Sequence, residues 1–162
     1  AYHFALFIGY NSLFYFSYLI MIFAFQSLFP GWALQSFLQT MAFTGFLLLA
    51  ITLSYSIYFL MICTAFWFGE VRMLIVAYNL ANRIFAGAII PLSFFPETAL
   101  KIIHATPLPY LINIPVHVAL GNIPQSDWIS FFLKGGIWLI ITISAGLGLY
   151  RLGIQRYEGF GG

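Results

Sequence analysis

The sequence predicts an all-α integral membrane domain with about four transmembrane helices, a re-entrant hairpin of short helices and no β-sheet. Hydrophobic residues make up 62% of the 162 residues and charged residues only 6%, whereas soluble domains carry about 25% charged residues. Residues 1–69 contain no Asp, Glu, Lys or Arg, and about 20 apolar residues already span a bilayer as a helix. These observations exclude a soluble protein.

The apolar segments are continuous, and this favours helices over strands. A membrane β-barrel would alternate inward polar and outward apolar residues, and long unbroken apolar runs can satisfy their backbone groups in lipid only as helices. The net charge of +2 is too small to indicate nucleic acid as a partner. Cys63 is the single cysteine, so the chain forms no internal disulfide.

The first two predicted spans lie in the uncharged part of a single transmembrane domain that covers residues 1–162. The first span covers about residues 4–29 and ends at Pro30-Gly31, a strong turn signal. The apolar run that follows continues to Phe68. As one straight helix it would measure about 55 Å, against about 30 Å of hydrocarbon. We therefore expect a span over about 35–61 with a continuation beyond it.

Two further spans are expected over about 71–91 and 128–150, and a proline-rich hairpin over about 91–126 separates them. Prolines this close together forbid a single spanning helix, because each interior proline costs about 3 kcal/mol. Short helices remain possible, and one is expected from Tyr110 towards Leu120 with a kink at Pro115, ending at Gly121. Six of the seven prolines fall in this region: Pro91, Pro96, Pro107, Pro109, Pro115 and Pro124.

The start of the hairpin predicts one short amphipathic helix. Pro96 suits the first turn of a helix, and Glu97 suits its positive N-terminal end. Lys101 and His104 suit its C-terminal end, and the helix should stop before Pro107. Two short helices at membrane depth are tolerated only where protein or a water-filled cavity covers their backbone, so the hairpin is expected to be re-entrant or interfacial.

The distribution of Lys and Arg predicts the orientation of the chain. Four spans place Arg72, Arg151 and Arg156 on one side, and Lys101 and Lys134 towards the other. An excess of Lys and Arg marks the cytoplasmic side. We therefore expect both termini in the cytoplasm and the proline-rich hairpin outside.

Four polar residues of the third predicted span are candidates for a pathway or a subunit interface. Arg72, Asn79 and Arg83 fall within about 20° of one helical face, and Asn82 lies to the side. An arginine inside a membrane usually faces the bundle interior or water. A polar stripe along a translocation path explains this pattern, and an arginine bonded to carbonyls or to a partner outside this chain explains it equally well.

The sequence offers no catalytic or metal-binding constellation. There is no G-x-S-x-G elbow, no H-E-x-x-H and no Gly-rich phosphate loop. His104 and His117 are thirteen residues apart with prolines between them, so no single helix presents both to a metal or haem. The chain is expected to be neither an enzyme nor a cofactor protein, and any ATP hydrolysis would need another subunit.

Three stretches together resemble a known family. They are ANRIFAGAIIPLSFFPE at residues 81–97, TPLPYLINIPVHVALGNI at residues 106–123, and the basic, aromatic tail YRLGIQRYEGFGG at residues 150–162. In this order around a final apolar span they resemble the ABC-2 type permeases of bacterial, particularly cyanobacterial-type, ABC exporters. The resemblance covers nearly the whole chain, with specific motifs only from about Phe68 onward.

The resemblance implies a six-helix transmembrane domain in the bacterial plasma membrane, with this chain as its C-terminal part. The chain begins without Met and without the pattern of a signal peptide, so we expect it to be a partial chain. The resemblance implies that two further spans precede it. The implied partners are ABC ATPase subunits, which carry ATP and Mg²⁺, and a second permease chain. The implied mechanism is export by alternating access, with the hairpin as a gate. Its candidate residues are Gly87, Pro91, Pro96, Pro107, Pro109 and Pro115.

Two other functions fit the composition. The chain could be a structural or assembly subunit of a larger membrane complex, since apolar and aromatic content suits that role as well. A membrane enzyme acting on lipid would need an acid/base or metal constellation, for which the sequence supplies only His104, His117, Glu97 and Asp127, scattered along the chain.

Overall fold

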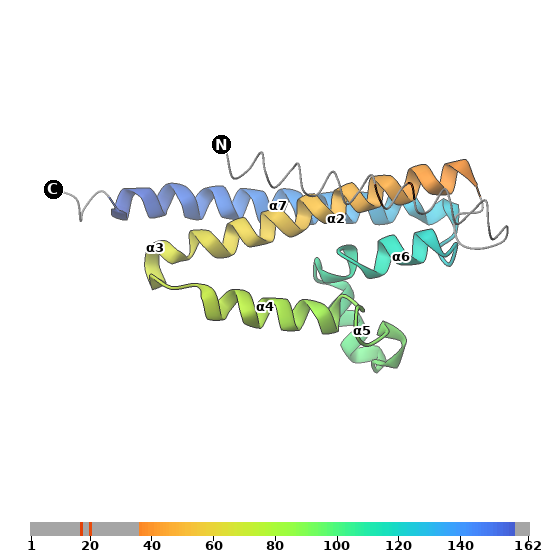
Figure 1. The fold of residues 1–162 in the computed structure, drawn as a ribbon, viewed down its shortest axis with the longest axis horizontal. Helices are drawn as coiled ribbons and strands as arrows, with labels where there is room; N and C mark the ends of the chain where they lie inside the picture. The colour runs from red at the N-terminus through yellow and green to blue at the C-terminus, as the bar shows by residue number, and fades with distance from the viewer. Residues whose placement is uncertain (1–16, 18–19, 21–35, 158–162) are drawn as a thin grey trace.

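The computed structural model describes residues 17, 20 and 36–157, and every regular element in this part of the chain is helical (Figure 1). The predicted span over 4–29 lies outside the described residues, apart from residues 17 and 20. Two helical stretches, Phe37–Phe68 and Gln125–Gln155, are long and apolar enough to cross a membrane. The predicted all-helical fold is confirmed for the described residues, while the number of membrane crossings stays a prediction.

Helix α2 (Phe37–Cys63) continues almost directly into the short helix α3 (Ala65–Phe68). At its start, the Ser36 hydroxyl accepts a hydrogen bond from the backbone N–H of the third helical residue at 3.2 Å, which satisfies one of the unpaired amides of the first turn. At its end, Gly69 has a φ of +71°, a conformation that glycine adopts without steric cost. We call Phe37–Phe68 the α2–α3 rod; it contains the continuation that was expected beyond residue 61.

Helix α7 (Gln125–Tyr157) runs parallel to the rod, in the same N- to C-terminal direction, and packs along it (Figure 1). Small residues on one face of α7 let the backbones approach, which is how helices associate in lipid. A hydrogen bond of 2.6 Å between the buried hydroxyls of Ser56 and Thr142 joins the two helices. The buried small positions of α7 are Gly135, Thr142, Gly146 and Gly153.

Helix α4 (Arg72–Phe85) returns along the rod but is only 14 residues long, about 21 Å at 1.5 Å per residue. The continuous helix expected over 71–91 is therefore shorter than predicted. It ends before Pro91, because the chain turns at Gly87 with a φ of +82° and the Ile89 N–H bonds back to a carbonyl of the last turn at 3.0 Å. A helix of this length does not cross about 30 Å of hydrocarbon alone.

Four short helices follow α4: η1 (Leu92–Phe94), α5 (Glu97–His104), η2 (Leu108–Tyr110) and α6 (Asn113–Ala119). The predicted amphipathic helix is confirmed as α5, with Pro96 as its N-cap residue.

The kink expected at Pro115 is absent, because α6 begins at Asn113 and Pro115 lies in its first turn. A proline is tolerated there, since the N–H groups of the first turn have no partner within the helix. The end expected at Gly121 is confirmed by its φ of +73°.

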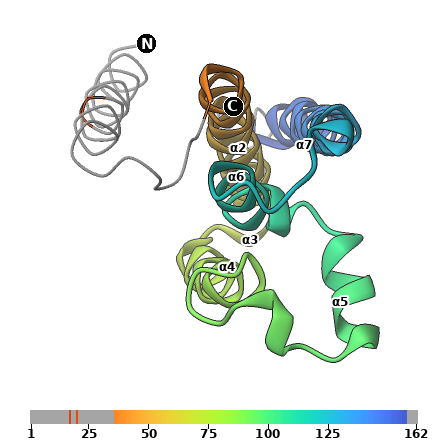
Figure 2. The ribbon, with the colours of Figure 1, turned by 90° about the vertical axis from the view of Figure 1, so that its right-hand side faces the viewer.

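Helix α6 lies against the first half of α2, so that α4 and α6 follow one another along the same side of the rod (Figures 1 and 2). The Gln39 side-chain amide donates hydrogen bonds to the carbonyls of Val118 at 3.0 Å and Ala119 at 2.9 Å. Val118 is fully buried and Tyr110 is only 6% exposed. The later part of the predicted hairpin is therefore packed into the core and does not form a free loop. The core residues are Phe43, Phe46, Leu49, Leu53, Ile57, Met61, Tyr110, Ile114 and Val118.

Candidate functional site

The C-terminal end of α4 lies near the middle of the α2–α3 rod. The Tyr58 hydroxyl donates a hydrogen bond to the side-chain oxygen of Asn79, and the rings of Tyr58 and Tyr78 meet edge to face with centroids 5.5 Å apart. Tyr58 is about ten residues, or about 15 Å, from the end of the rod at Phe68. Because α4 runs antiparallel to the rod, Arg83 lies about one helical turn nearer to the midpoint than Asn79.

Two buried polar atoms at this place have no hydrogen-bond partner among the described residues: the Tyr78 hydroxyl oxygen and the Asn82 side-chain oxygen. They lie one turn apart on α4. An unpaired buried polar group costs about 1–3 kcal/mol, so each such group calls for an explanation, such as a bound water or a ligand. The site thus holds unmet hydrogen-bonding capacity inside the packed helices.

The predicted polar stripe divides between two surfaces. Asn79 faces α2 and accepts the Tyr58 hydrogen bond, whereas Arg72 and Arg83 are exposed. Arg72 pairs with Glu70 at 3.6 Å, but both side chains are more than 70% exposed and such pairs add little stability. In the described part of the chain Arg83 has no ion-pair partner; its position in the last turn of α4 complements the negative end of the helix dipole.

The gate candidates fall into buried and exposed groups. A Cβ atom at Gly87 would lie 3.3 Å from the Asn113 amide nitrogen and 3.5 Å from Leu92, so this turn is closely packed against the chain that leads into α6. Pro109 and Pro115 are buried and Pro107 is half-buried, while Pro91 and Pro96 are exposed. We call the segment between α4 and α6, residues 86–112, the insertion. It is closely packed at both ends and carries exposed residues in between.

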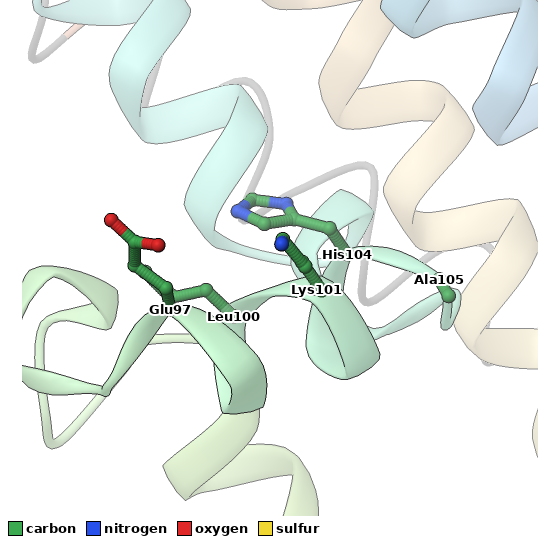
Figure 3. Close-up of a pocket in the computed structure, with 5 residues that line it drawn as sticks. All are labelled: Glu97, Leu100, Lys101, His104 and Ala105. Atoms are coloured by element: carbon green, nitrogen blue, oxygen red, sulfur yellow. The ribbon is translucent and has the colours of Figure 1, made fainter.

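The exposed part of the insertion carries a wide, open hollow along one face of α5 (Figure 3). Its volume is about 540 Å³. A carboxylate, an ammonium group and an imidazole all project from this face, together with two apolar side chains. The lining residues are Glu97, Leu100, Lys101, His104 and Ala105.

The structure brings no metal-ligand set together. In the described ranges, no three His, Cys, Asp or Glu side chains form a group that could hold a metal ion. The His117 ring nitrogen Nδ1 is hydrogen-bonded with the Asn122 amide at 3.1 Å.

Two residues with structural hydrogen bonds, Gln39 and Tyr58, were not predicted from the sequence. Each is a hydrogen-bonding side chain inside a predicted apolar span, where such groups are expensive unless they find a partner. This cost was the signal in the sequence that Gln39 and Tyr58 each bind a partner within the fold. Which carbonyl or side chain each would bind was not readable from the sequence, because the partners lie 79 and 21 residues away.

The paired tyrosines give a direct test of how α4 is attached. Tyr58→Phe should lower the thermal stability of the purified protein, because it removes a donor and leaves Asn79 unpaired, at a cost of about 1 kcal/mol. Tyr78→Phe should be neutral or stabilising, because its hydroxyl has no partner in the described residues. Melting temperatures in one detergent measure both variants. Equal losses would contradict this account of the α2–α4 contact.

A model of the ABC-2 family transporter proteins matches residues 11–161, which is almost the whole chain. No curated protein and no solved structure gives a significant match. The family match confirms the resemblance drawn from the sequence, and the long apolar helices of the structure agree with it. Since the match covers far more than half of the sequence, this chain belongs to the ABC-2 family of transporter proteins.

Proposed function

We propose that this chain is the membrane-spanning permease of an ATP-driven exporter and works with separate ATPase subunits and a second permease chain. Membership of the ABC-2 transporter family supports this role, and the family implies association with an ABC ATPase. ATP and Mg²⁺ would be bound by the ATPase subunits. The chain would lie in a bacterial plasma membrane with both termini in the cytoplasm.

The observation that favours transport over a purely structural role is the break between the two helices α4 and α6, which lie beside the α2–α3 rod. Helix α4 stops at Phe85 and α6 begins only at Asn113, with the exposed charged residues Glu97 and Lys101 between them. Non-helical backbone at membrane depth requires a protein or water-filled surrounding, and transporters place binding sites at such interruptions. A scaffold helix bundle has no need of this arrangement.

The packing suggests which helices stay fixed and which helices move during transport. The α2–α3 rod and α7 form one tightly packed pair, while α4 and the insertion contact this pair over a smaller area. Alternating access would then move α4 and the insertion relative to the α2–α7 pair, as rigid elements shift in other two-state transporters.

The test is purification of the full-length protein in mild detergent, with mass spectrometry of the proteins that accompany it. We expect a Walker-motif ATPase in stoichiometric amount, and ATP-dependent transport after reconstitution of that complex. Recovery of other membrane subunits without any ATPase would overturn the proposal and assign the chain to a structural or assembly role.

A second test addresses the insertion as a gate. Phe94 is 79% exposed, so Phe94→Cys in a Cys63→Ala background offers a site for an oxidative crosslink between two permease chains. The crosslink should arrest transport, and reduction should restore it. Ile140→Cys, on the outward face of α7, is the matched control. Undiminished transport by the crosslinked protein would remove the gating role.

A further inference from the structure

The two ends of the insertion between α4 and α6 pack near the middle part of the α2–α3 rod. On one side, the rings of Phe85 and Phe95 lie 6.1 Å apart, so α5 starts beside the end of α4. On the other side, Tyr110 packs with Leu49 around Gly135: a Cβ atom there would lie 2.6 Å from Leu49 and 3.2 Å from Tyr110. Leu49 is about 18 Å from the start of the rod.

These contacts place α5 within the hydrocarbon layer if the rod crosses the membrane. The rod is 32 residues long, or about 48 Å, and about 30 Å of it would lie in hydrocarbon. Centred on the rod, this layer begins about 9 Å from either end. The attachment points at Leu49 and at Tyr58 both lie well inside it, and α5 itself adds only about 12 Å.

Charged side chains at this depth cannot face lipid. Arg83, Glu97, Lys101 and His104 are all exposed, and a single central Arg or Lys costs about 2.5–3.5 kcal/mol even on the mildest insertion scales. Water is the surrounding that satisfies these exposed side chains together.

A second copy of the chain does not neutralise this surface. The whole sequence contains four acidic residues, and Glu70 is already paired with Arg72 at the start of α4. At the insertion, the two cations Arg83 and Lys101 outnumber Glu97, the single acid among the residues named above. A symmetric partner would bring the same excess of cations, so the group that complements this surface is an anion.

We propose that the end of α4 and the hollow of α5 line a water-filled vestibule at membrane depth, which accepts the anionic group of an amphiphilic substrate. This inference rests on the proposed function for its membrane setting. Arg83 and Lys101 supply the positive field, which is strengthened by the low-dielectric surroundings. Phe94 and Ile102, which are 79% and 70% exposed, offer apolar contact next to the charged hollow for the hydrocarbon part of the same molecule.

The test measures water access and charge preference at a single cysteine. Ala105 lines the hollow, so Ala105→Cys in a Cys63→Ala background leaves every charge in place. The full-length protein, with whatever subunits purify with it, is placed in nanodiscs and treated with an anionic and a cationic methanethiosulfonate reagent. We expect Ala105→Cys to react roughly tenfold faster than Ile140→Cys on α7, and to prefer the anionic reagent by roughly threefold relative to an exposed Gln125→Cys control.

The charge variants distinguish a reagent preference caused by positive side chains from reactivity that reflects only water access to the cysteine. The double variant Arg83→Gln/Lys101→Gln should reduce the preference for the anionic reagent to that of the Gln125→Cys control. The double variant Arg83→Lys/Lys101→Arg keeps both charges, so it should retain this preference and serves as the control for folding. Reaction as slow as that of Ile140→Cys, or no preference for the anionic reagent, would overturn the vestibule. No nucleotide or ATPase is needed, so the outcome is independent of the co-purification that tests the proposed function.

Discussion

Replacement of Gly135 by leucine is expected to cause a severe loss of stability. Gly135 is buried on α7, where even a Cβ atom would lie 2.6 Å from Leu49 of α2 and 3.2 Å from Tyr110 of η2. Both neighbours belong to the packed core, so they cannot move aside without shifting other side chains. Overpacking costs about 1–3 kcal/mol at ordinary core sites, and here it would separate three elements at once. We expect little folded protein.

The neighbouring glycine is the matched control. Gly136 lies on the same helix, but a Cβ atom there meets nothing within 4 Å. Gly136→Leu should leave folding unchanged or improve it slightly, since glycine in a helix interior is about 1 kcal/mol less favourable than alanine. Monodisperse yield after gel filtration and the melting temperature in detergent measure both variants. Similar behaviour of the two leucine variants would show that α7 does not pack against the rod through the Gly135 face.

Gln39→Met is expected to release α6 from the rod. The Gln39 amide is 7% exposed and donates to the carbonyls of Val118 and Ala119. Val118 keeps a bond from the Gly121 N–H at 3.2 Å, whereas Ala119 loses the partner described here. Methionine keeps the length of the side chain but donates no hydrogen bond, and an unpaired carbonyl costs about 1–3 kcal/mol.

Hydrogen exchange measures this effect locally. In Gln39→Met, the backbone amides of α6 should exchange roughly tenfold faster or more, because local opening becomes easier, while those of α7 should change little. Thr40→Val is the control, since the Thr40 hydroxyl bonds only to the Ser36 carbonyl one turn before it, at 3.2 Å. Unchanged exchange in α6 would show that the Gln39 bonds do not hold the insertion. Arrested transport with this exchange pattern would connect α6 to the proposed gate.

Local chemistry made several elements readable from the sequence. The length of the uncharged run predicted a helix through 35–61 with a continuation, which the structure shows as the α2–α3 rod. The order Pro96, Glu97, Lys101 and His104 predicted α5, because capping and the helix dipole act within a few residues. Glycine and proline marked the end of α6 at Gly121 for the same reason.

The end of α4 and the directions of its polar side chains could not be predicted from local sequence patterns. The apolar run up to Pro91 gave no sign that α4 would stop at Phe85, because the turn at Gly87 depends on packing against Asn113 and Leu92. The polar stripe was drawn from the helical period alone, and the period does not show that Tyr58 would draw Asn79 towards α2 while Arg83 stays exposed.

Composition by itself determined that the chain belongs in a membrane and is helical, because burial of apolar surface and satisfaction of the backbone leave no other choice in lipid. Only the tertiary structure decided how α4 and α6 share one side of the rod. That arrangement depends on contacts between residues far apart in the chain: Gln39 with the end of α6, and Gly135 with Leu49 and Tyr110. Lipid already solvates apolar side chains, so close packing and buried hydrogen bonds select the partners, and these act only after the helices meet.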